Sequence, residues 1–161
     1  MKNKLKRIIF TLSILCLSII CSSSYYHTKK GGCEKESLMI EATNKLKKYT
    51  LIQDFPFYIK KKKKSGEIEY KKQIITLNRG VNYKFYTIRN TDYDGMPILS
   101  IYNNEKQEFL LGTTYNTTLK KFYSEIDFEC KTTGNYCLSL CFQDGLEGCA
   151  VGVFASMIKQ Q

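Results

Sequence analysis

Apolar and polar side chains alternate along much of the chain from residue 55 to residue 157. A period of two puts successive side chains on opposite faces of a strand, so the pattern predicts β-strands with one buried face. Clusters of Gly, Asn, Asp, Ser and Thr interrupt the pattern and indicate turns. The predicted strands cover residues 55–62, 67–77, 82–89, 97–102, 107–113, 123–130, 135–143 and 149–157.

About eight short strands with no helix between them predict a mainly β protein, an antiparallel β-sandwich or jelly roll. The clearest alternation lies in residues 123–130, where Ile126, Phe128 and Cys130 are expected to face inward. In residues 135–143 the expected inward row is Tyr136, Leu138, Leu140 and Phe142. A turn at Gly134 joins the two segments, so we expect them to pair as a hairpin.

One helix is predicted ahead of the strands, from Glu34 to about Tyr49. Met39, Ala42, Leu46 and Tyr49 would share its apolar face. Acidic residues come early and lysines late in this segment, as the helix dipole favours. Residues 34–161 are therefore predicted to be a single β-sandwich domain with a short N-terminal helix.

The first residues predict export from the cytoplasm. Residues 1–7 carry three lysines and an arginine, and residues 8–20 are apolar or hydroxyl-bearing without any charge. A basic start followed by a short apolar run is typical of a secretory signal peptide, predicted here as residues 1–21. Residues 22–33 are small or polar and are expected to form a flexible tether.

Cys21 follows the apolar run and is itself followed by Ser22, Ser23 and Ser24. This order resembles the signal of bacterial lipoproteins and implies lipidation of Cys21, which predicts an outer-membrane or periplasmic lipoprotein. Ile20 stands where such signals carry a small residue, so two alternatives stay open. Cleavage among the serines would release a soluble secreted protein, and an uncleaved anchor helix would cover only about 20 Å.

The chain has 25 Lys and Arg against 15 Asp and Glu. Removing the signal leaves 21 basic residues against the same 15 acidic ones, with lysines concentrated at 60–64 and 71–72. A patch for anionic lipid or polysaccharide is one interpretation, and a solvated hairpin tip with lysines that keep edge strands apart is the other. No arginine-aromatic motif indicates a nucleic-acid partner.

Five cysteines remain after the signal, an odd number that cannot all pair within one chain: Cys33, Cys130, Cys137, Cys141 and Cys149. The spacing does not fix the connectivity. Cys130 and Cys137 flank a tight turn and are the candidate disulfide pair. Cys137 and Cys141 would share a strand face too far apart to bond, and buried free thiols are the expected fate of the others.

Residues that could perform catalysis are scarce in this sequence. The one histidine, His27, lies in the predicted tether, which argues against Ser-His-Asp or Cys-His catalysis in the folded domain. Glu125, Asp127 and Glu129 could serve a glycosidase by residue type, but their alternation indicates the solvated face of a strand. No enzyme activity and no cofactor are predicted. An Asp-x-Asp-Gly sequence at 92–95 allows a calcium loop, but it lacks a later acidic partner.

Tyrosine could bind a glycan as well as fill a core, and the chain has 12 tyrosines and no tryptophan. Tyr83 and Tyr86 lie on opposite faces of one predicted strand, so at least one ring is expected to be partly exposed. These two tyrosines are the candidate ligand contacts, and a carbohydrate-binding module is the alternative function.

Parts of the second half resemble known exported β-domains. The segment LSIYNNEKQEFL at 99–110 is similar to the central hairpin of bacterial pre-peptidase C-terminal domains. Residues 126–140 resemble the closing strands of that family, and Gly134, Tyr136 and the Cys-Phe pair at 141–142 loosely match the end of the Golgi-dynamics sandwich domain. The stretch is also similar to small exported proteins of Bacteroidetes, including the GCAVGV strand at 148–153.

The resemblance spans roughly residues 75–157 and implies an accessory or interaction module rather than an enzyme. The sequence therefore predicts a non-catalytic, exported binding or scaffolding protein of the cell envelope. Its expected partners are a membrane, through the lipid anchor, and a protein or a glycan.

Overall fold

The structure is a computed structural model, and it describes residues 33–60 and 68–157. All of them belong to one compact unit that begins at Cys33. The predicted signal, the lipidation residue Cys21, most of the tether and four of the five clustered lysines lie outside the described residues.

The described residues form one α-helix, a short 3-10 helix and ten strands. Their bounds are α2 Lys35–Leu46, β1 Tyr49–Ile59, β2 Lys71–Leu77, β3 Asn82–Arg89, β4 Pro97–Tyr102, β5 Leu110–Thr113, β6 Tyr115–Asn116, β7 Lys121–Phe122, β8 Glu125–Glu129, β9 Gly134–Phe142, η1 Gln143–Gly145 and β10 Gly148–Met157.

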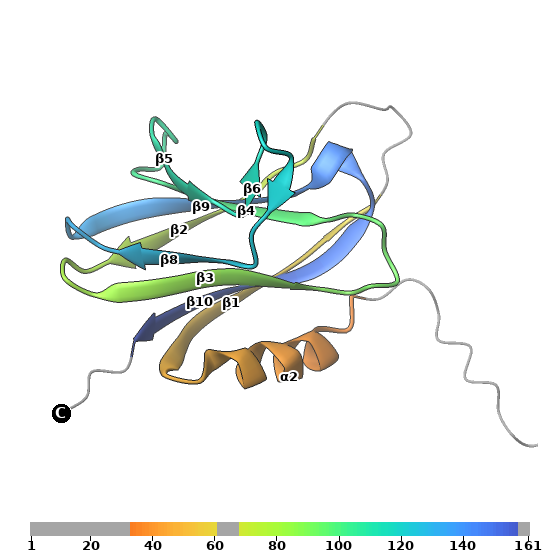
Figure 1. Cartoon of the computed structure of the whole chain (residues 1–161), viewed down its shortest axis with the longest axis horizontal. Helices are drawn as coiled ribbons and strands as arrows, with labels where there is room; N and C mark the ends of the chain where they lie inside the picture. Colours follow the sequence, from red (N-terminus) through yellow and green to blue (C-terminus); the bar gives the residue numbers. More distant parts are fainter. Residues whose placement is uncertain (1–32, 61–67, 158–161) are drawn as a thin grey trace, which may run out of the picture. The chain divides into compact units, whose positions relative to one another are not determined.

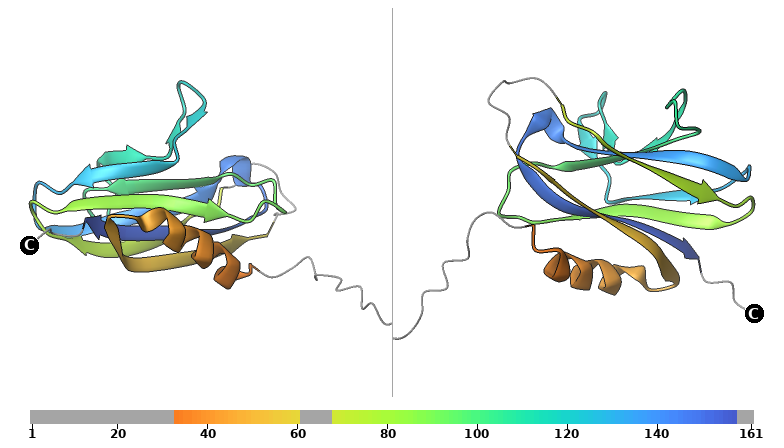
Figure 2. Two further views of the ribbon diagram at one scale, coloured as in Figure 1. Left: turned by 60° about the horizontal axis from the view of Figure 1, so that its bottom comes forward. Right: turned by 180° about the vertical axis from the view of Figure 1, so that it is seen from behind.

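Two antiparallel four-stranded sheets pack face to face (Figure 1). The first sheet has the strand order β1-β10-β3-β8, and the second has the order β2-β9-β4-β5. β6 and β7 form a small separate hairpin that projects from the body (Figure 2). α2 lies on the outer face of the first sheet, so the molecule has three layers in the order helix, sheet, sheet.

The main core lies between the two sheets and is built from aromatic and aliphatic side chains of both. The rings of Phe57 and Phe142 stack across it with centroids 4.7 Å apart, and Phe85 stacks on Phe154 at 5.0 Å. A second core lies between α2 and the first sheet, where Leu38, Ala42 and Leu46 are buried.

β10 is buried on both faces because it lies between the helix layer and the second sheet. Its sequence, GCAVGVFASM, is accordingly an apolar run of small and medium side chains rather than an alternating one. Gly148 is required by close packing, since a Cβ atom there would lie 2.3 Å from the ring of Phe142.

The predicted fold class is confirmed: the protein is mainly β, with antiparallel sheets and one N-terminal helix. Strands β3 and β4 coincide with the predicted ranges 82–89 and 97–102. The helix ends earlier than predicted, at Leu46, and Tyr49 begins β1 instead. β1 is an edge strand, which explains how it accommodates Pro56. No helix among the described residues is long and apolar enough to span a membrane.

The predicted hairpin between residues 123–130 and 135–143 is wrong. β8 pairs with β3 in the first sheet, whereas β9 pairs with β2 and β4 in the second. The chain between them crosses from one sheet to the other. Both predicted inward rows nevertheless face the same core, one row from each sheet. Two strands that face each other across a core show the same alternation as the two strands of a hairpin, so the pattern alone does not distinguish these arrangements.

Candidate functional site

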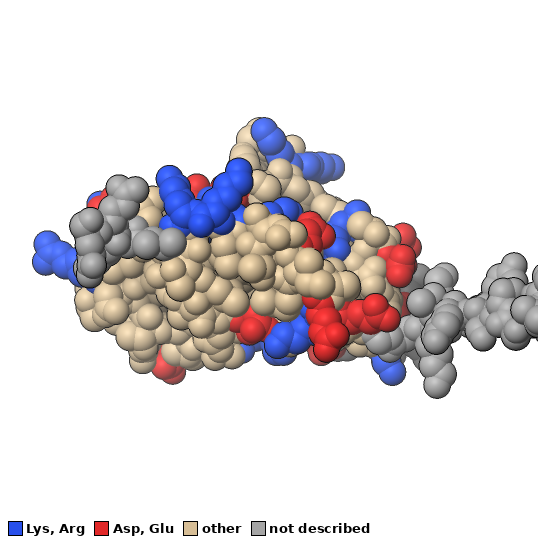
Figure 3. Space-filling model, turned by 90° about the horizontal axis from the view of Figure 1, so that it is seen from below, with Lys and Arg blue, Asp and Glu red and all other residues tan. Residues whose placement is uncertain are grey.

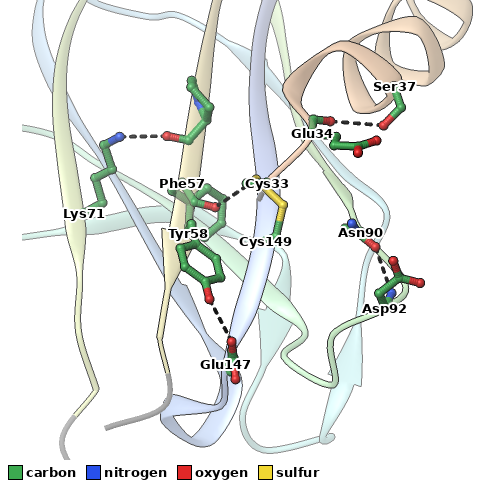
Figure 4. Close-up of a disulfide and its surroundings, with 11 residues drawn as sticks. Cys33, Glu34, Ser37, Phe57, Tyr58, Lys71, Asn90, Asp92, Glu147 and Cys149 are labelled. Carbon is green, nitrogen blue, oxygen red and sulfur yellow. Dashed lines mark hydrogen bonds between the residues drawn. A yellow bond between two sulfur atoms is a disulfide. The ribbon is translucent and has the colours of Figure 1, made fainter. Parts of the chain in front are cut away.

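A disulfide joins Cys33, two residues before α2, to Cys149 in β10 (Figure 4). Their Cα atoms are 5.4 Å apart, and 116 positions separate them in the sequence. Next to it, the Tyr58 hydroxyl donates a hydrogen bond of 2.8 Å to the carboxylate of Glu147. The disulfide therefore links the residues just before α2 covalently to β10, the strand that lies between the helix and the second sheet.

The predicted pairing of Cys130 with Cys137 is wrong, because both thiols are free. Cys130 faces the core between the sheets, and its Sγ lies 3.6 Å from the hydroxyl of Tyr136. Cys137 follows the inward-facing Tyr136 in β9, so its side chain points to the opposite side of the second sheet. The two thiols thus lie on different sides of that sheet.

Cys137 and Cys141 share the outer face of the second sheet, as predicted, and both thiols are buried and free. A free thiol was predicted for Cys141 but not for Cys137, the candidate partner of Cys130. Cys33 and Cys149, also predicted to be free thiols, form the disulfide instead. Burial raises the pKa of the Cys137 thiol and raises that of Cys141 to about 11. Both thiols are therefore protonated at neutral pH, and such thiols are poor nucleophiles and poor metal ligands.

The prediction that Tyr83 or Tyr86 contacts a ligand is also wrong. Tyr83 is 4% exposed and lies in the core between the sheets, where its hydroxyl accepts a hydrogen bond from the backbone N–H of Asn78. Tyr86 points to the other face and is 2% exposed, because α2 covers it and the carbonyl of Ala42 accepts a hydrogen bond from its hydroxyl. Carbohydrate binding through these two rings is excluded.

The acidic row of β8 faces outward as predicted, but one buried lysine engages two of its members. Lys84 of β3 forms ion pairs with Glu125 and with Asp127, the latter at 2.8 Å. The hydrogen bond from Lys84 lowers the pKa of the Asp127 carboxyl, and the Tyr49 hydroxyl donates to the same carboxylate at 3.3 Å. These carboxylates form a structural ion-pair network at the edge of the first sheet.

The Asp-x-Asp-Gly segment lies in the connection between β3 and β4. The side-chain oxygen of Asn90 accepts the backbone N–H of Asp92 at 2.8 Å, the contact that closes an Asx turn. Within residues 33–60 and 68–157, no three His, Cys, Asp or Glu side chains gather closely enough to hold a metal ion.

A hollow of about 350 Å³ opens at the base of the β6–β7 hairpin, beside α2 and the end of β3. Its lining combines charged, hydroxyl and aromatic side chains: Glu41, Lys45, Thr87, Arg89, Thr91, Phe122, Tyr123 and Ser124. The apolar residues Ile88, Met96 and Pro97 complete the lining. No motif in the sequence indicates this site, since its members come from four separate segments.

The outer face of the second sheet is not covered by any helix among the described residues. Apolar side chains are exposed at both of its edges: Tyr70 just before β2 and Ile74 within it, and Phe109, Leu110 and Leu111 at the beginning of β5. Leu110 pairs with Tyr102 of β4 and shares its outward direction. The small buried residues Cys137 and Ser139 lie between these edges on β9. We refer to this surface as the apolar face. On the opposite side, viewed from α2, both signs of charge are present (Figure 3).

The sequence of β2 and the residue before it contains a signal for the apolar face. Tyr70 and Ile74 occupy alternate positions that the period of two assigns to solvent, and Lys72 lies between them. Large apolar residues on a solvated strand face are typical of an interaction surface.

No protein-family model matches the chain, and a search of curated proteins finds no match.

Proposed function

We propose that this protein is a non-catalytic binding or scaffolding protein of the cell envelope, exported from the cytoplasm and held at a membrane by a lipid on Cys21. The disulfide between Cys33 and Cys149 supports the compartment, because structural disulfides persist where the environment is oxidising. The basic and apolar start of the chain supports export, and the Cys-Ser-Ser-Ser order supports the anchor.

The apolar face is the observation that carries the binding role. Large apolar side chains that are exposed on one face of a sheet can mark a site of protein–protein contact. Here exposed side chains of β2 and β5 flank small buried ones, while the other sheet is covered by α2. A protein partner that covers this face would remove these side chains from water.

The ion-pair network of Lys84 supports the non-catalytic part of the proposal. A pair of acidic catalysts needs one carboxyl held protonated and one ionised. The contacts of Lys84 favour the ionised form at Asp127, and Glu125 pairs with the same ammonium group. Both side chains therefore bind one shared lysine, which is the arrangement of a structural ion-pair network.

The lipid anchor is tested by metabolic labelling with a radioactive fatty acid in the producing cell. We expect the wild-type chain to incorporate label and to fractionate with membranes, because the acyl chain would be attached at Cys21. The Cys21→Ser variant should lose both properties, whereas Cys16→Ser, another cysteine of the apolar start, should keep them. An unlabelled wild type, or label that persists in Cys21→Ser, contradicts the anchor.

The apolar face is tested by photocrosslinking in the same cells. A benzoylphenylalanine at Leu110, 53% exposed, should yield a discrete crosslinked species, because that position lies on the apolar face. The matched control is Ile40, 67% exposed on the outer side of α2, which should yield none. Equal crosslinking at the two positions, or none at Leu110, contradicts the proposed binding surface.

A further inference from the structure

We propose that the hollow at the base of the β6–β7 hairpin binds an acidic sugar, that is, a pyranose ring carrying a carboxylate. The hollow lies at the side of α2 and β3, and it shares no lining residue with the apolar face. This inference goes beyond the proposed envelope role and depends on neither the lipid anchor nor a protein partner.

The size and position of the hollow suit a small polar ligand. Its volume of about 350 Å³ lies at the lower end of the range found for ligand pockets. The pairing of β3 with β8 ends at Tyr86 and Glu125. No described strand therefore pairs with residues 87–89 on that side, where all three residues line the hollow.

Arg89 supplies a positive charge without a compensating carboxylate. One of its guanidinium nitrogens donates to the backbone carbonyl of Tyr93 at 3.2 Å, and it forms no ion pair with a described residue. The other two charged residues of the lining, Glu41 and Lys45, pair with each other at 3.2 Å. Among the lining residues, the net charge therefore resides on Arg89, whose planar donors match the geometry of a carboxylate.

Three hydroxyl groups at the hollow are available to a ligand. The side chains of Thr87, Thr91 and Ser124 line it, and none of them forms a hydrogen bond with another described residue. Hydroxyls can donate and accept, which is the chemistry that the hydroxyl groups of a sugar require. A simple carboxylate such as acetate would engage Arg89 but would leave these groups unused.

Tyr123 supplies an aromatic surface for the apolar side of a sugar ring. It lines the hollow and is 43% exposed. Its backbone N–H donates to the carbonyl of Thr114 at 2.8 Å, and the Nζ of Lys121 lies 5.4 Å from the centre of its ring. A glycan contact is therefore assigned to Tyr123 in place of the buried Tyr83 and Tyr86.

Fluorescence of the full-length Tyr123→Trp variant tests this proposal, because the chain has no other tryptophan. Sodium glucuronate should change the emission saturably, and glucose should bind about tenfold more weakly because it cannot form the charged hydrogen bonds. Adding Arg89→Gln should weaken glucuronate about tenfold and leave glucose unchanged. Circular dichroism establishes that each variant is folded.

A tryptophan at Tyr70, an exposed tyrosine of the apolar face, is the matched control and should not respond to either sugar. Sodium acetate separates a simple anion site from a sugar site. The proposal is overturned if glucuronate causes no saturable change at position 123, or if acetate or glucose binds as tightly as glucuronate. An unchanged glucuronate affinity in the folded Arg89→Gln variant overturns it as well. Fatty-acid labelling reports separately on the anchor, so the two proposals can fail independently.

Discussion

Replacing Cys149 with alanine is expected to lower the free energy of unfolding by about 4 kcal/mol, because a bond between residues 116 positions apart restricts the unfolded chain strongly. Cys33→Ala should have nearly the same effect. The double variant should be no less stable than either single variant, since one covalent bond is lost in each case. Urea denaturation followed by circular dichroism measures all three.

The matched control for this series is Cys141→Ala, which removes a buried thiol that forms no disulfide. It should cost about 1 kcal/mol. A reducing agent should destabilise the wild type to the level of Cys149→Ala and leave that variant unchanged. Additive losses in the double variant, or a wild type insensitive to reduction, would show that the two cysteines are not joined.

Phe142→Ala is expected to cost about 3–5 kcal/mol, the range for truncating a large buried side chain that leaves a cavity. Phe142 is fully buried, stacks on Phe57 and contacts Gly148, so it joins β1, β9 and β10. Thermal or denaturant unfolding measures the loss. The matched control is Phe109→Ala, a ring 66% exposed on the apolar face, which should cost less than about 0.5 kcal/mol.

A double-variant cycle with Gly148→Ala refines this test. The added methyl group would overlap the ring of Phe142, so Gly148→Ala alone should destabilise by about 1–3 kcal/mol. Its cost should be smaller in the Phe142→Ala background, because the ring that it overlaps is gone. Strict additivity of the two substitutions would contradict the close packing of β10 against β9.

The alternation of side chains predicted the fold class and most strands, because one face of each predicted strand meets the core. It predicted inward residues such as Phe128 and Leu138 correctly. It could not predict which strands pair, since residues from two sheets that share a core have the same pattern as residues of one hairpin. Strands β6 and β7 have two residues each, too few to show any period.

The third layer explains the errors at the candidate site. The prediction that at least one of the rings of Tyr83 and Tyr86 is partly exposed assumed a two-layer sandwich, in which the outer face of β3 would lie in water. α2 covers that face, so the second ring is buried as well as the first. Cys33 and Cys149 are adjacent only because α2 packs on β10, and no local spacing in the sequence contains that information.

We propose that this chain operates outside the cytoplasm, and its structure has two sheets and a helix that a disulfide links to β10. Non-reducing peptide mapping by mass spectrometry, on protein isolated from the envelope of the producing cell, tests the disulfide and the exported location together. The expected result is a linked peptide pair containing Cys33 and Cys149, with Cys130, Cys137 and Cys141 alkylated as free thiols after unfolding. Recovery of Cys33 and Cys149 as free thiols, or of Cys130 joined to Cys137, would contradict it.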